Sequence, residues 1–283
     1  MVLRRVRLKV VVVGERAVGK TSLIQKYMRN HFSPEYKGTL GVQMHPVEVE
    51  VPLDGGDVVL AKVAIFDLMG EHAARESFRD AIFYGTHGVL AVCDAGRTET
   101  LYAIPDWIRA AAVVTGGVPF TIALNKVDRS NSIGIGEAET SWLRQQFPLS
   151  PVILTSAMTG QGVEEAFHGI FARAVAARID AEKARHRANL LRHEILVFIS
   201  AREGLGASKT ELFSRFRDVP PAQLMQELDY LIRLELLALE AEGSKPFVQT
   251  ASMPASARCR ITPTGRKLAE SPSTDEMVIE EPS

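Results

Sequence analysis

Cysteine is scarce in this sequence. Its two cysteines, Cys93 and Cys259, lie in segments far apart in the chain. Neither a framework of disulfides nor a cysteine-based zinc site is therefore expected. Cysteines that stay reduced are typical of the cytoplasm, which is the location that we expect.

An excess of charge of either sign is also missing. The 33 lysines and arginines nearly balance the 34 aspartates and glutamates, which leaves a formal net charge of -1. The protein as a whole therefore creates no field that attracts it to nucleic acid or to an anionic membrane, although local patches can still do so.

Long apolar runs are absent as well. The longest ones, such as Val10–Val13 and Ile122–Leu124, have the length of strands and are too short to span a bilayer. The basic N-terminal residues are followed by a short apolar run that ends at Gly14, which does not fit a secretory signal. Position 2 is valine, and the last residues contain no cysteine to prenylate. We expect neither an integral membrane segment nor a lipid anchor.

The length and composition fit a soluble globular protein with two domains. The chain has 283 residues, of which 46% are hydrophobic and 24% charged. We expect a first domain over residues 1–180 and a second over residues 190–270. Residues 181–192 are rich in Ala, Glu, Lys and Arg without Gly or Pro, which predicts a helical connector. Residues 271–283 are acidic and rich in Ser and Pro, which predicts a disordered tail.

Strand and helix signals alternate in the first domain. The expected strands are Val6–Val13, Val47–Val51, Val58–Phe66, Gly88–Cys93, Phe120–Leu124 and Val152–Leu154. The expected helices are Lys20–Asn30, Leu101–Val114, Glu137–Phe147 and Val163–Ile179. This alternation predicts an α/β fold with a mostly parallel, six-stranded sheet and helices on both faces. The Gly-rich turn at Asp54–Asp57 predicts one antiparallel hairpin at an edge.

The second domain has a different pattern. The expected helices are Leu190–Ile199, Ser208–Phe216, Pro220–Leu234 and a last one that begins near Thr264. Ser208 and Glu211 have the spacing of a capping box. Short strands are expected at Leu236–Leu239 and Arg258–Ile261. Three helices followed by a two-stranded wing make this α+β domain similar to a winged-helix domain.

The strongest chemical signal is the segment Gly14–Thr21, which fits the pattern G-x-x-x-x-G-K-[ST] of phosphate-binding loops. An apolar strand ends at Val13 and a helix begins near Lys20, so the pattern stands in the context that it requires. A chance match in a glycine-rich turn is the alternative, which this context disfavours. The glycines let main-chain N–H groups surround phosphate oxygens. We expect Lys20 to reach the β- and γ-phosphates, and the Thr21 hydroxyl to bind Mg²⁺.

A second motif concerns the base. Asn125-Lys126-Val127-Asp128 follows an apolar strand, at the edge where open α/β sheets bind ligands. The Asp128 carboxylate can accept hydrogen bonds from the ring N–H and the amino group of guanine, whereas adenine presents an acceptor there. Thr155-Ser156-Ala157 ends the next strand, where a main-chain N–H can bind the guanine carbonyl. The four-residue motif alone also fits a polar turn, but together the motifs predict a guanine nucleotide.

At this point residues 4–180 closely resemble the Ras-like small GTPase family, with Rab-like features. Five motifs match in family order: Gly14–Thr21, Tyr36–Val42, Asp67–Gly70, Asn125–Asp128 and Thr155–Ala157. The resemblance implies a Ras-like fold and a molecular switch that binds GTP or GDP with Mg²⁺ and hydrolyses GTP. It further implies protein effectors and regulators as partners, whereas no feature of the sequence sets the oligomeric state.

The resemblance also implies roles for single residues. Thr39 would bind Mg²⁺ in the GTP state, Asp67 would bind it through water, and the Gly70 N–H would contact the γ-phosphate. The metal set is therefore Thr21, Thr39 and Asp67. The set expected to bind the nucleotide is Gly14, Ala17, Val18, Gly19, Lys20, Thr21, Ser22, Asn125, Lys126, Asp128, Ser156, Ala157 and Met158.

The sequence departs from the family pattern near the expected γ-phosphate. Glu71 replaces a glutamine that orients the attacking water, and Leu68-Met69 replaces a Thr-Ala pair. Arg16 stands where Ras itself has glycine, so it can act as an arginine finger in cis, block one from a partner, or face solvent. The catalytic candidates are Lys20, Thr39, Gly70, Glu71 and Arg16. A protein that binds GTP without hydrolysing it is therefore an open alternative.

Winged-helix domains often bind DNA, so a GTP-gated DNA-binding regulator is the rival hypothesis. The expected recognition helix contains Glu227 and Asp229 but only Arg233 as a cation, which fits the DNA backbone poorly. The wing does contain the cations Lys245, Arg258 and Arg260, so nucleic acid is a possible but not a favoured partner. We favour a protein-interaction module.

Overall fold

A computed structural model describes residues 4–30, 42–53, 56–68, 79–129, 134–202, 204–240 and 257–271. The chain divides into two compact units, Met1–Asp180 and Ala181–Ser283. Several residues of the sequence analysis lie outside the described ranges: Tyr36, Thr39, Met69, Gly70, Glu71, Lys245 and the tail after Ser271.

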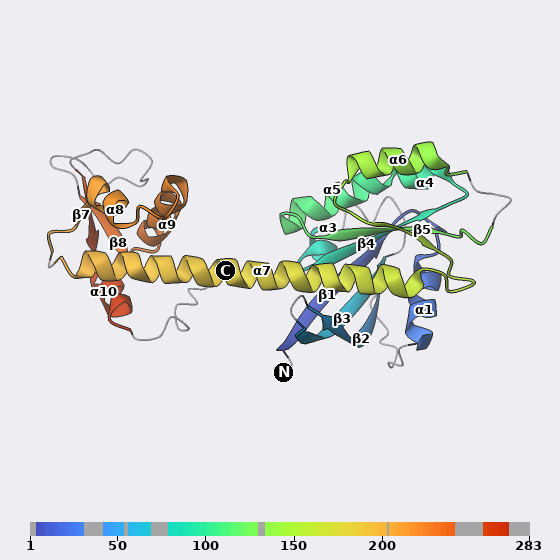
Figure 1. Ribbon diagram of the computed structural model, residues 1–283, viewed down its shortest axis with the longest axis horizontal. Coiled ribbons are helices and arrows are strands. Elements are labelled where there is room, and N and C mark those ends of the chain that lie inside the picture. The colour runs from blue at the N-terminus through green and yellow to red at the C-terminus, as the bar shows by residue number, and fades with distance from the viewer. Residues whose placement is uncertain are drawn as a thin grey trace. The chain divides into compact units, whose positions relative to one another are not determined.

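The first unit contains a six-stranded sheet with the order β2-β3-β1-β4-β5-β6 (Figure 1). Its strands are β1 (Arg4–Val13), β2 (Val42–Pro52), β3 (Val58–Leu68), β4 (Gly88–Asp94), β5 (Phe120–Asn125) and β6 (Val152–Thr155). Every neighbouring pair is parallel except β2–β3 at one edge. The expected α/β fold with one antiparallel edge pair is therefore confirmed.

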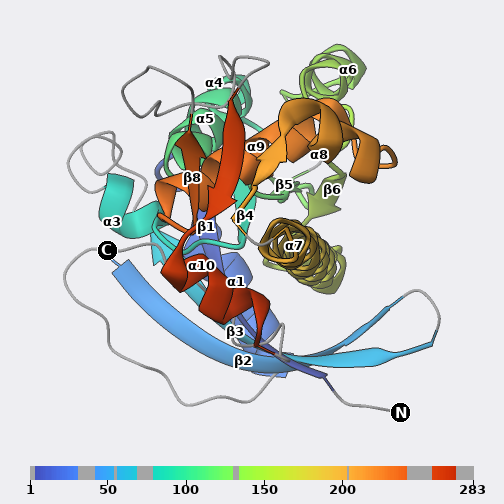
Figure 2. The same ribbon diagram turned by 90° about the vertical axis from the view of Figure 1, so that its left-hand side faces the viewer.

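The edge hairpin is longer than the sequence pattern predicts. The β2–β3 ladder runs without a break from the pair Val42 and Leu68 to the pair Pro52 and Val58. Figure 2 shows the two strands as a long, curved ribbon. The expected strands missed this extension because its residues include polar ones such as Gln43 and His45, which interrupt the apolar signal without preventing main-chain pairing.

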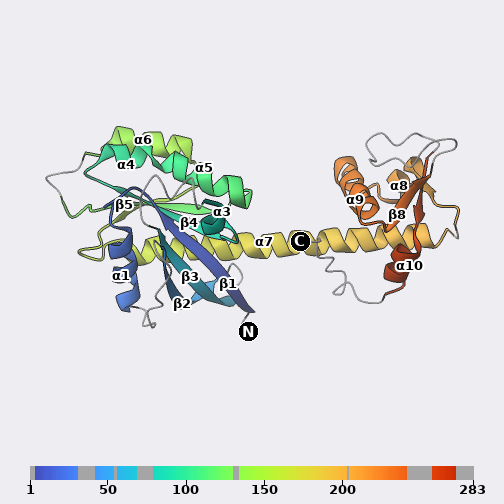
Figure 3. The same cartoon turned by 180° about the vertical axis from the view of Figure 1, so that it is seen from behind.

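Helices cover both faces of the sheet, as expected (Figures 1 and 3). They are α1 (Lys20–Asn30), α3 (Arg79–Phe83), α4 (Thr98–Tyr102), α5 (Ile104–Thr115), α6 (Glu137–Gln146) and α7 (Val163–Ser200). One buried cluster joins α1 and the first part of α7 to one face, through residues such as Tyr27 and Phe167. A second cluster joins α3, α4, α5 and α6 to the other face, through residues such as Phe83 and Trp107.

Two predicted helix boundaries are wrong. The expected helix Leu101–Val114 consists of α4 and α5, which are separated at Ala103. Pro105 occupies the first turn of α5, where a missing N–H is tolerated, whereas in the middle of a longer helix it would break a hydrogen bond. The helix expected to end at Ile179 continues to Ser200, so residues 181–192 belong to one helix of 38 residues.

In its described residues, the second unit combines the end of α7 with three further helices and a small sheet. The elements are β7 (Ala207–Ser208), α8 (Lys209–Arg215), α9 (Pro221–Arg233), β8 (Leu237–Glu240), β9 (Arg258–Ile261) and α10 (Pro263–Ala269). Its core contains Ile195 and Leu196 of α7, Leu228 and Leu231 of α9, and Cys259 of β9.

The small sheet is antiparallel, with the order β7-β9-β8. It has three strands rather than the two expected, because β7 is two residues long and too short to leave an apolar pattern. The expected capping box is present: Glu211 N–H donates to Ser208 Oγ at 3.3 Å, and Ser208 N–H donates to Glu211 Oε2 at 2.8 Å. Among the described helices of both units, none combines the length and apolar character that a membrane span requires.

Candidate nucleotide-binding site

The loop Gly14–Gly19 connects β1 to α1 at the carboxyl end of the parallel strands, and two of its positions demand glycine. Gly14 has a φ of +139°, and a Cβ there would lie 2.1 Å from the main-chain oxygen of Val92. Gly19 has a φ of +99°, and its Cβ would lie 2.4 Å from Nδ2 of Asn125. The loop therefore packs directly against the ends of β4 and β5.

Side chains of the Asn125–Asp128 segment hold this loop through hydrogen bonds to the main-chain carbonyl groups of the loop. Asn125 Nδ2 donates to the Val18 carbonyl at 2.8 Å, and Lys126 Nζ donates to the Ala17 carbonyl at 2.6 Å. The Ala157 N–H donates to Asn125 Oδ1 at 3.3 Å, which orients the Asn125 amide. Three motifs that are far apart in the sequence thus meet at one edge of the sheet.

Lys20 lies across the phosphate-binding loop. Its Nζ donates to the carbonyl groups of Gly14 at 2.9 Å and Glu15 at 3.0 Å. Burial lowers the pKa of Lys20, whereas the nearby charges of Asp67 and Glu15 raise it. A buried ammonium group that is bonded to neutral carbonyls is well placed to pair with an anion bound in the loop.

Thr21 and Asp67 come together from α1 and β3. Thr21 Oγ1 donates to Asp67 Oδ2 at 2.5 Å. Burial raises the pKa of Asp67, and the hydrogen bond from Thr21 and the charges of Lys20 and His45 oppose that shift. Hydroxyl and carboxylate oxygens suit Mg²⁺. No cluster of three or more His, Cys, Asp or Glu residues that could hold a metal lies within the described ranges. Thr21 and Asp67 are the members of the expected metal set that these ranges include.

Asp128 is oriented by the loop after β6. Ser156 Oγ donates to Asp128 Oδ1 at 2.5 Å, and the same hydroxyl accepts the N–H of Thr159 at 3.1 Å. One carboxylate oxygen is thereby held by the protein. The carboxylate faces a pocket next to the phosphate-binding loop.

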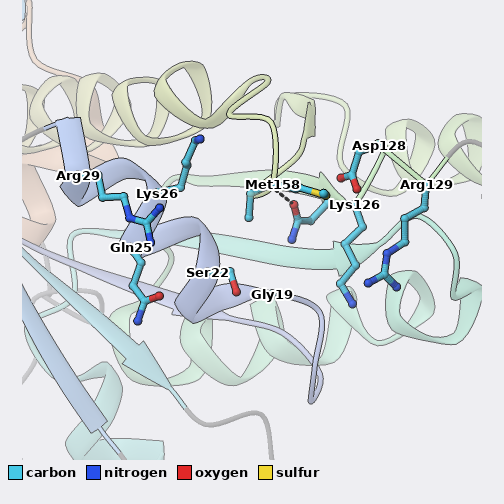
Figure 4. A pocket seen from close by; sticks show the side chains of 11 residues that line it. Gly19, Ser22, Gln25, Lys26, Arg29, Lys126, Asp128, Arg129 and Met158 are labelled. Carbon is cyan, nitrogen blue, oxygen red and sulfur yellow. Dashed lines mark hydrogen bonds between the residues drawn. The ribbon is translucent and has the colours of Figure 1, made fainter.

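This pocket has a volume of about 360 Å³ and lies between α1 and the loops after β5 and β6 (Figure 4). Seven of its lining residues belong to the expected nucleotide set: Gly19, Ser22, Asn125, Lys126, Asp128, Ala157 and Met158. Four more were not expected: Gln25, Lys26, Arg29 and Arg129. The first three follow the phosphate-binding motif along α1, so their helical spacing from Ser22 was the signal that could have identified them.

Asp94 and Arg97 were also missed. Asp94 Oδ2 accepts hydrogen bonds from Lys126 Nζ at 2.7 Å and from Arg97 Nε at 3.3 Å. Arg97 Nη2 donates to the carbonyl of Arg16 at 2.8 Å, whereas the Arg16 side chain itself is exposed. The available signal was a carboxylate directly after the apolar strand Gly88–Cys93, because the neighbouring strands β1 and β5 end at Val13 and Asn125, beside the two expected motifs.

Comparison with known proteins agrees with this arrangement. The Ras family matches residues 9–176 of the chain. The Ypt/Rab-type GTPase avaA of Emericella nidulans is 30% identical over 186 residues, which cover 64% of this chain and 87% of that protein.

Two further relatives are matched over a smaller share of their own length. DnaJ homolog subfamily C member 27-A of Xenopus laevis is 28% identical over 179 residues, or 61% of this chain and 63% of that protein. DnaJ homolog subfamily C member 27 of Rattus norvegicus is 30% identical over 176 residues, or 60% of this chain and 62% of that protein. The chain therefore spans less than two thirds of these relatives. The extent of the family match, the sheet order and the loop geometry lead to one conclusion: this chain belongs to the Ras family.

Proposed function

We propose that this protein is a GTP-binding molecular switch of the cytoplasm that hydrolyses GTP to GDP and phosphate with Mg²⁺. The observation that supports this most is the junction of the loop Gly14–Gly19 with Asn125 and Lys126, beside the pocket that Asp128 faces. In this arrangement the loop that would bind phosphate lies next to the carboxylate that would distinguish purines.

The phosphate chain would lie in the loop. Its main-chain N–H groups and the N-terminus of α1 favour anions. Lys20 would exchange its bonds to the Gly14 and Glu15 carbonyls for bonds to phosphate oxygens, which are stronger because both partners are charged.

The metal would bind beside these phosphates. The Thr21 hydroxyl would bind Mg²⁺ directly and Asp67 would bind it through water, while Thr39 would add an oxygen from the first switch. When bound, Mg²⁺ supplies positive charge next to the β- and γ-phosphates. The buried Asp67 carboxylate would gain a cationic neighbour, which favours its ionised form.

The base would bind in the pocket, where Asp128 selects guanine. Ser156 already donates to one Asp128 oxygen, which holds the carboxylate in place for the two donors of the base. Adenine presents an acceptor to the same carboxylate and would leave it unpaired. Lys126 would cover one face of the base.

Hydrolysis and signalling would depend on the two switch segments. Thr39 and the Gly70 N–H would contact the γ-phosphate side only while that phosphate is present, so GTP would order both segments for effectors and regulators. Glu71 and Arg16 are the proposed modulators of the rate. The exposed Arg16 side chain agrees with either a role at the γ-phosphate or plain solvation.

The decisive experiment is mass spectrometry of the nucleotide that copurifies with the full chain, followed by calorimetry with GTP and ATP in Mg²⁺. We expect GDP or GTP in the protein, and binding of GTP but not of ATP. Lys20→Ala should weaken GTP binding by roughly 100-fold or more, because a charge-assisted bond is lost. Equal affinity for GTP and ATP would refute the proposal.

Phosphate release from GTP then tests hydrolysis. Wild-type protein should release phosphate in Mg²⁺, and Glu71→Ala and Arg16→Ala should change the rate if these residues act on the reaction. Unchanged rates would remove both from the mechanism. Binding without any release, even with cell extract added, would instead favour a GTP-binding protein that does not cycle.

For the second unit we propose a winged-helix-like module that binds protein partners. The two arginines of its wing support protein binding more than they support DNA binding. Arg258 Nη2 lies 3.0 Å from Glu211 Oε2, and Arg260 Nε lies 2.8 Å from Glu240 Oε2, so both wing arginines are already paired with carboxylates. A gel shift with duplex DNA at low salt should show no complex, and a salt-dependent complex would overturn this preference.

A further inference from the structure

Four consecutive residues of the phosphate-binding loop are each held by a different side chain. The carbonyl groups of Ala17 and Val18 accept hydrogen bonds from Lys126 and Asn125, which belong to the expected guanine motif. Two further bonds come from the segment Asp94–Trp107, which belongs to none of the expected motifs. Arg97 Nη2 donates to the Arg16 carbonyl at 2.8 Å, and Trp107 Nε1 donates to Glu15 Oε1 at 3.2 Å.

Asp94 connects the two sets of bonds. Its Oδ2 accepts from both Lys126 and Arg97, and its Oδ1 accepts the Gly96 N–H at 3.0 Å. The Asp94 N–H donates to Thr100 Oγ1 at 2.9 Å. Burial alone would raise the pKa of Asp94, but the hydrogen bonds from Lys126 and Gly96 and the charges of Lys126 and Arg97 together lower it. An ionised carboxylate thus holds both cations in fixed positions.

Because the peptide group is planar, the hydrogen bonds to these carbonyl groups also determine where the neighbouring main-chain N–H groups point. In a trans peptide the C=O of one residue and the N–H of the next point in opposite directions. Arg97, Lys126 and Asn125 hold the carbonyl groups of residues 16, 17 and 18. They therefore also set the directions of the N–H groups of residues 17, 18 and 19, which are the groups that would surround the phosphates.

We propose that Arg97 is a positioning residue that orients the Ala17 N–H and thereby slows the release of the bound nucleotide. The inference rests on the proposed function. Asp94 would act with Arg97 by holding its guanidinium group in place. The Asp94 side chain is 6% exposed, whereas that of Arg97 is 39% exposed. Because Arg97 is partly exposed, a protein that draws this side chain away would speed nucleotide exchange.

The test is the dissociation rate of fluorescent GDP from the full chain in Mg²⁺, measured after addition of excess unlabelled GDP. Arg97→Ala should dissociate roughly 5–10-fold faster, as expected for the loss of one hydrogen bond from a charged donor. Arg97→Lys keeps the charge and one donor, so its rate should lie between those of Arg97→Ala and wild type. The matched control is Arg109→Ala, which removes an exposed arginine of α5 that pairs with Asp106, and its rate should equal that of wild type.

A second measurement separates positioning from general loss of structure. Urea unfolding of the nucleotide-free protein, followed by tryptophan fluorescence, should give the same midpoint for Arg97→Ala and wild type. An unchanged dissociation rate in Arg97→Ala, or a faster rate matched by a lower midpoint, would overturn the inference while leaving the proposed function intact. Failure of the wild-type protein to bind fluorescent GDP would instead refute the proposed function itself.

Discussion

Arg192 of α7 and Glu227 of α9 form a buried ion pair in the second unit, with Nε of the arginine 2.5 Å from Oε2 of the glutamate. The guanidinium also lies 3.7 Å from the centre of the Tyr230 ring, and its Nη1 donates to Asn189 Oδ1 at 3.1 Å. Both charged side chains are largely withdrawn from solvent, at 17% and 8% exposure. This pair fixes the contact between the two helices.

Glu227→Ala should therefore destabilise the second unit by about 3 kcal/mol, because it leaves a buried guanidinium without its counter-charge. Combining Arg192→Met with Glu227→Leu should recover most of that loss. Glu240→Ala, which breaks an exposed pair, should cost under about 1 kcal/mol and serves as the control.

Guanidinium unfolding followed by circular dichroism measures this effect. The two tryptophans, Trp107 and Trp142, lie in the first unit, so their fluorescence reports that unit alone. The unfolding transition that is seen by dichroism but not by fluorescence should have its midpoint at a lower guanidinium concentration in Glu227→Ala than in wild type. A shift of similar size in Glu240→Ala would contradict the role of burial.

The phosphate-binding loop should tolerate no side chain at Gly14. Gly14→Ala would bring a Cβ to 2.1 Å from the Val92 carbonyl, so β1 and β4 would have to separate. We expect a loss of more than about 2 kcal/mol in the first unit. Gly85→Ala is a matched control, because Gly85 also has a positive φ but its Cβ would meet nothing within 4 Å. Its cost should be about 1 kcal/mol. Similar unfolding midpoints for the two variants, measured by tryptophan fluorescence, would count against the close contact between a Cβ at position 14 and the Val92 carbonyl.

Asp128→Asn should change which base is bound. The Asn oxygen can still accept from Ser156, which leaves the amide NH₂ to face the base. Guanine presents an amino donor there, whereas xanthine presents a carbonyl acceptor. We expect affinity for GDP to fall by roughly 100-fold or more and affinity for xanthosine diphosphate to rise. Calorimetry with both nucleotides measures the ratio, and an unchanged preference for GDP would place the base elsewhere.

The two cysteines should be inert in the folded protein. Burial raises the pKa of the Cys93 thiol from 9.0 to about 12, and burial does the same for Cys259. At pH 8 both thiols stay protonated and inaccessible, so a thiol reagent should label neither until guanidinium is added, when it should label both. Because the unfolded thiols ionise near pH 9, their contribution to stability is complete below that pH and is lost as pH rises toward 12. Rapid labelling of native protein would show that one of the cores opens.

The helix boundaries show what a local pattern can and cannot specify. The beginning of α1 at Lys20 and the capped beginning of α8 follow from residues adjacent in the chain, and both were predicted. The residues of α7 were predicted as three separate helical stretches rather than as one helix, because apolar periodicity stops where the helix leaves one core at Ile179 and resumes where it enters another at Leu191. Hydrogen bonding continues across the polar stretch between them.

The sequence by itself determined the phosphate-binding loop, since the glycines, Lys20 and Thr21 are contiguous and their chemistry is local. It also predicted that Asn125 and Asp128 bind guanine, through a motif of four adjacent residues. Only the tertiary structure decided that Asp94 and Arg97 hold this loop. Their bonds to Lys126 and to the Arg16 carbonyl join residues 32 and 81 positions apart. Such contacts depend on β4 lying between β1 and β5, an order set by how the whole sheet packs rather than by any single segment.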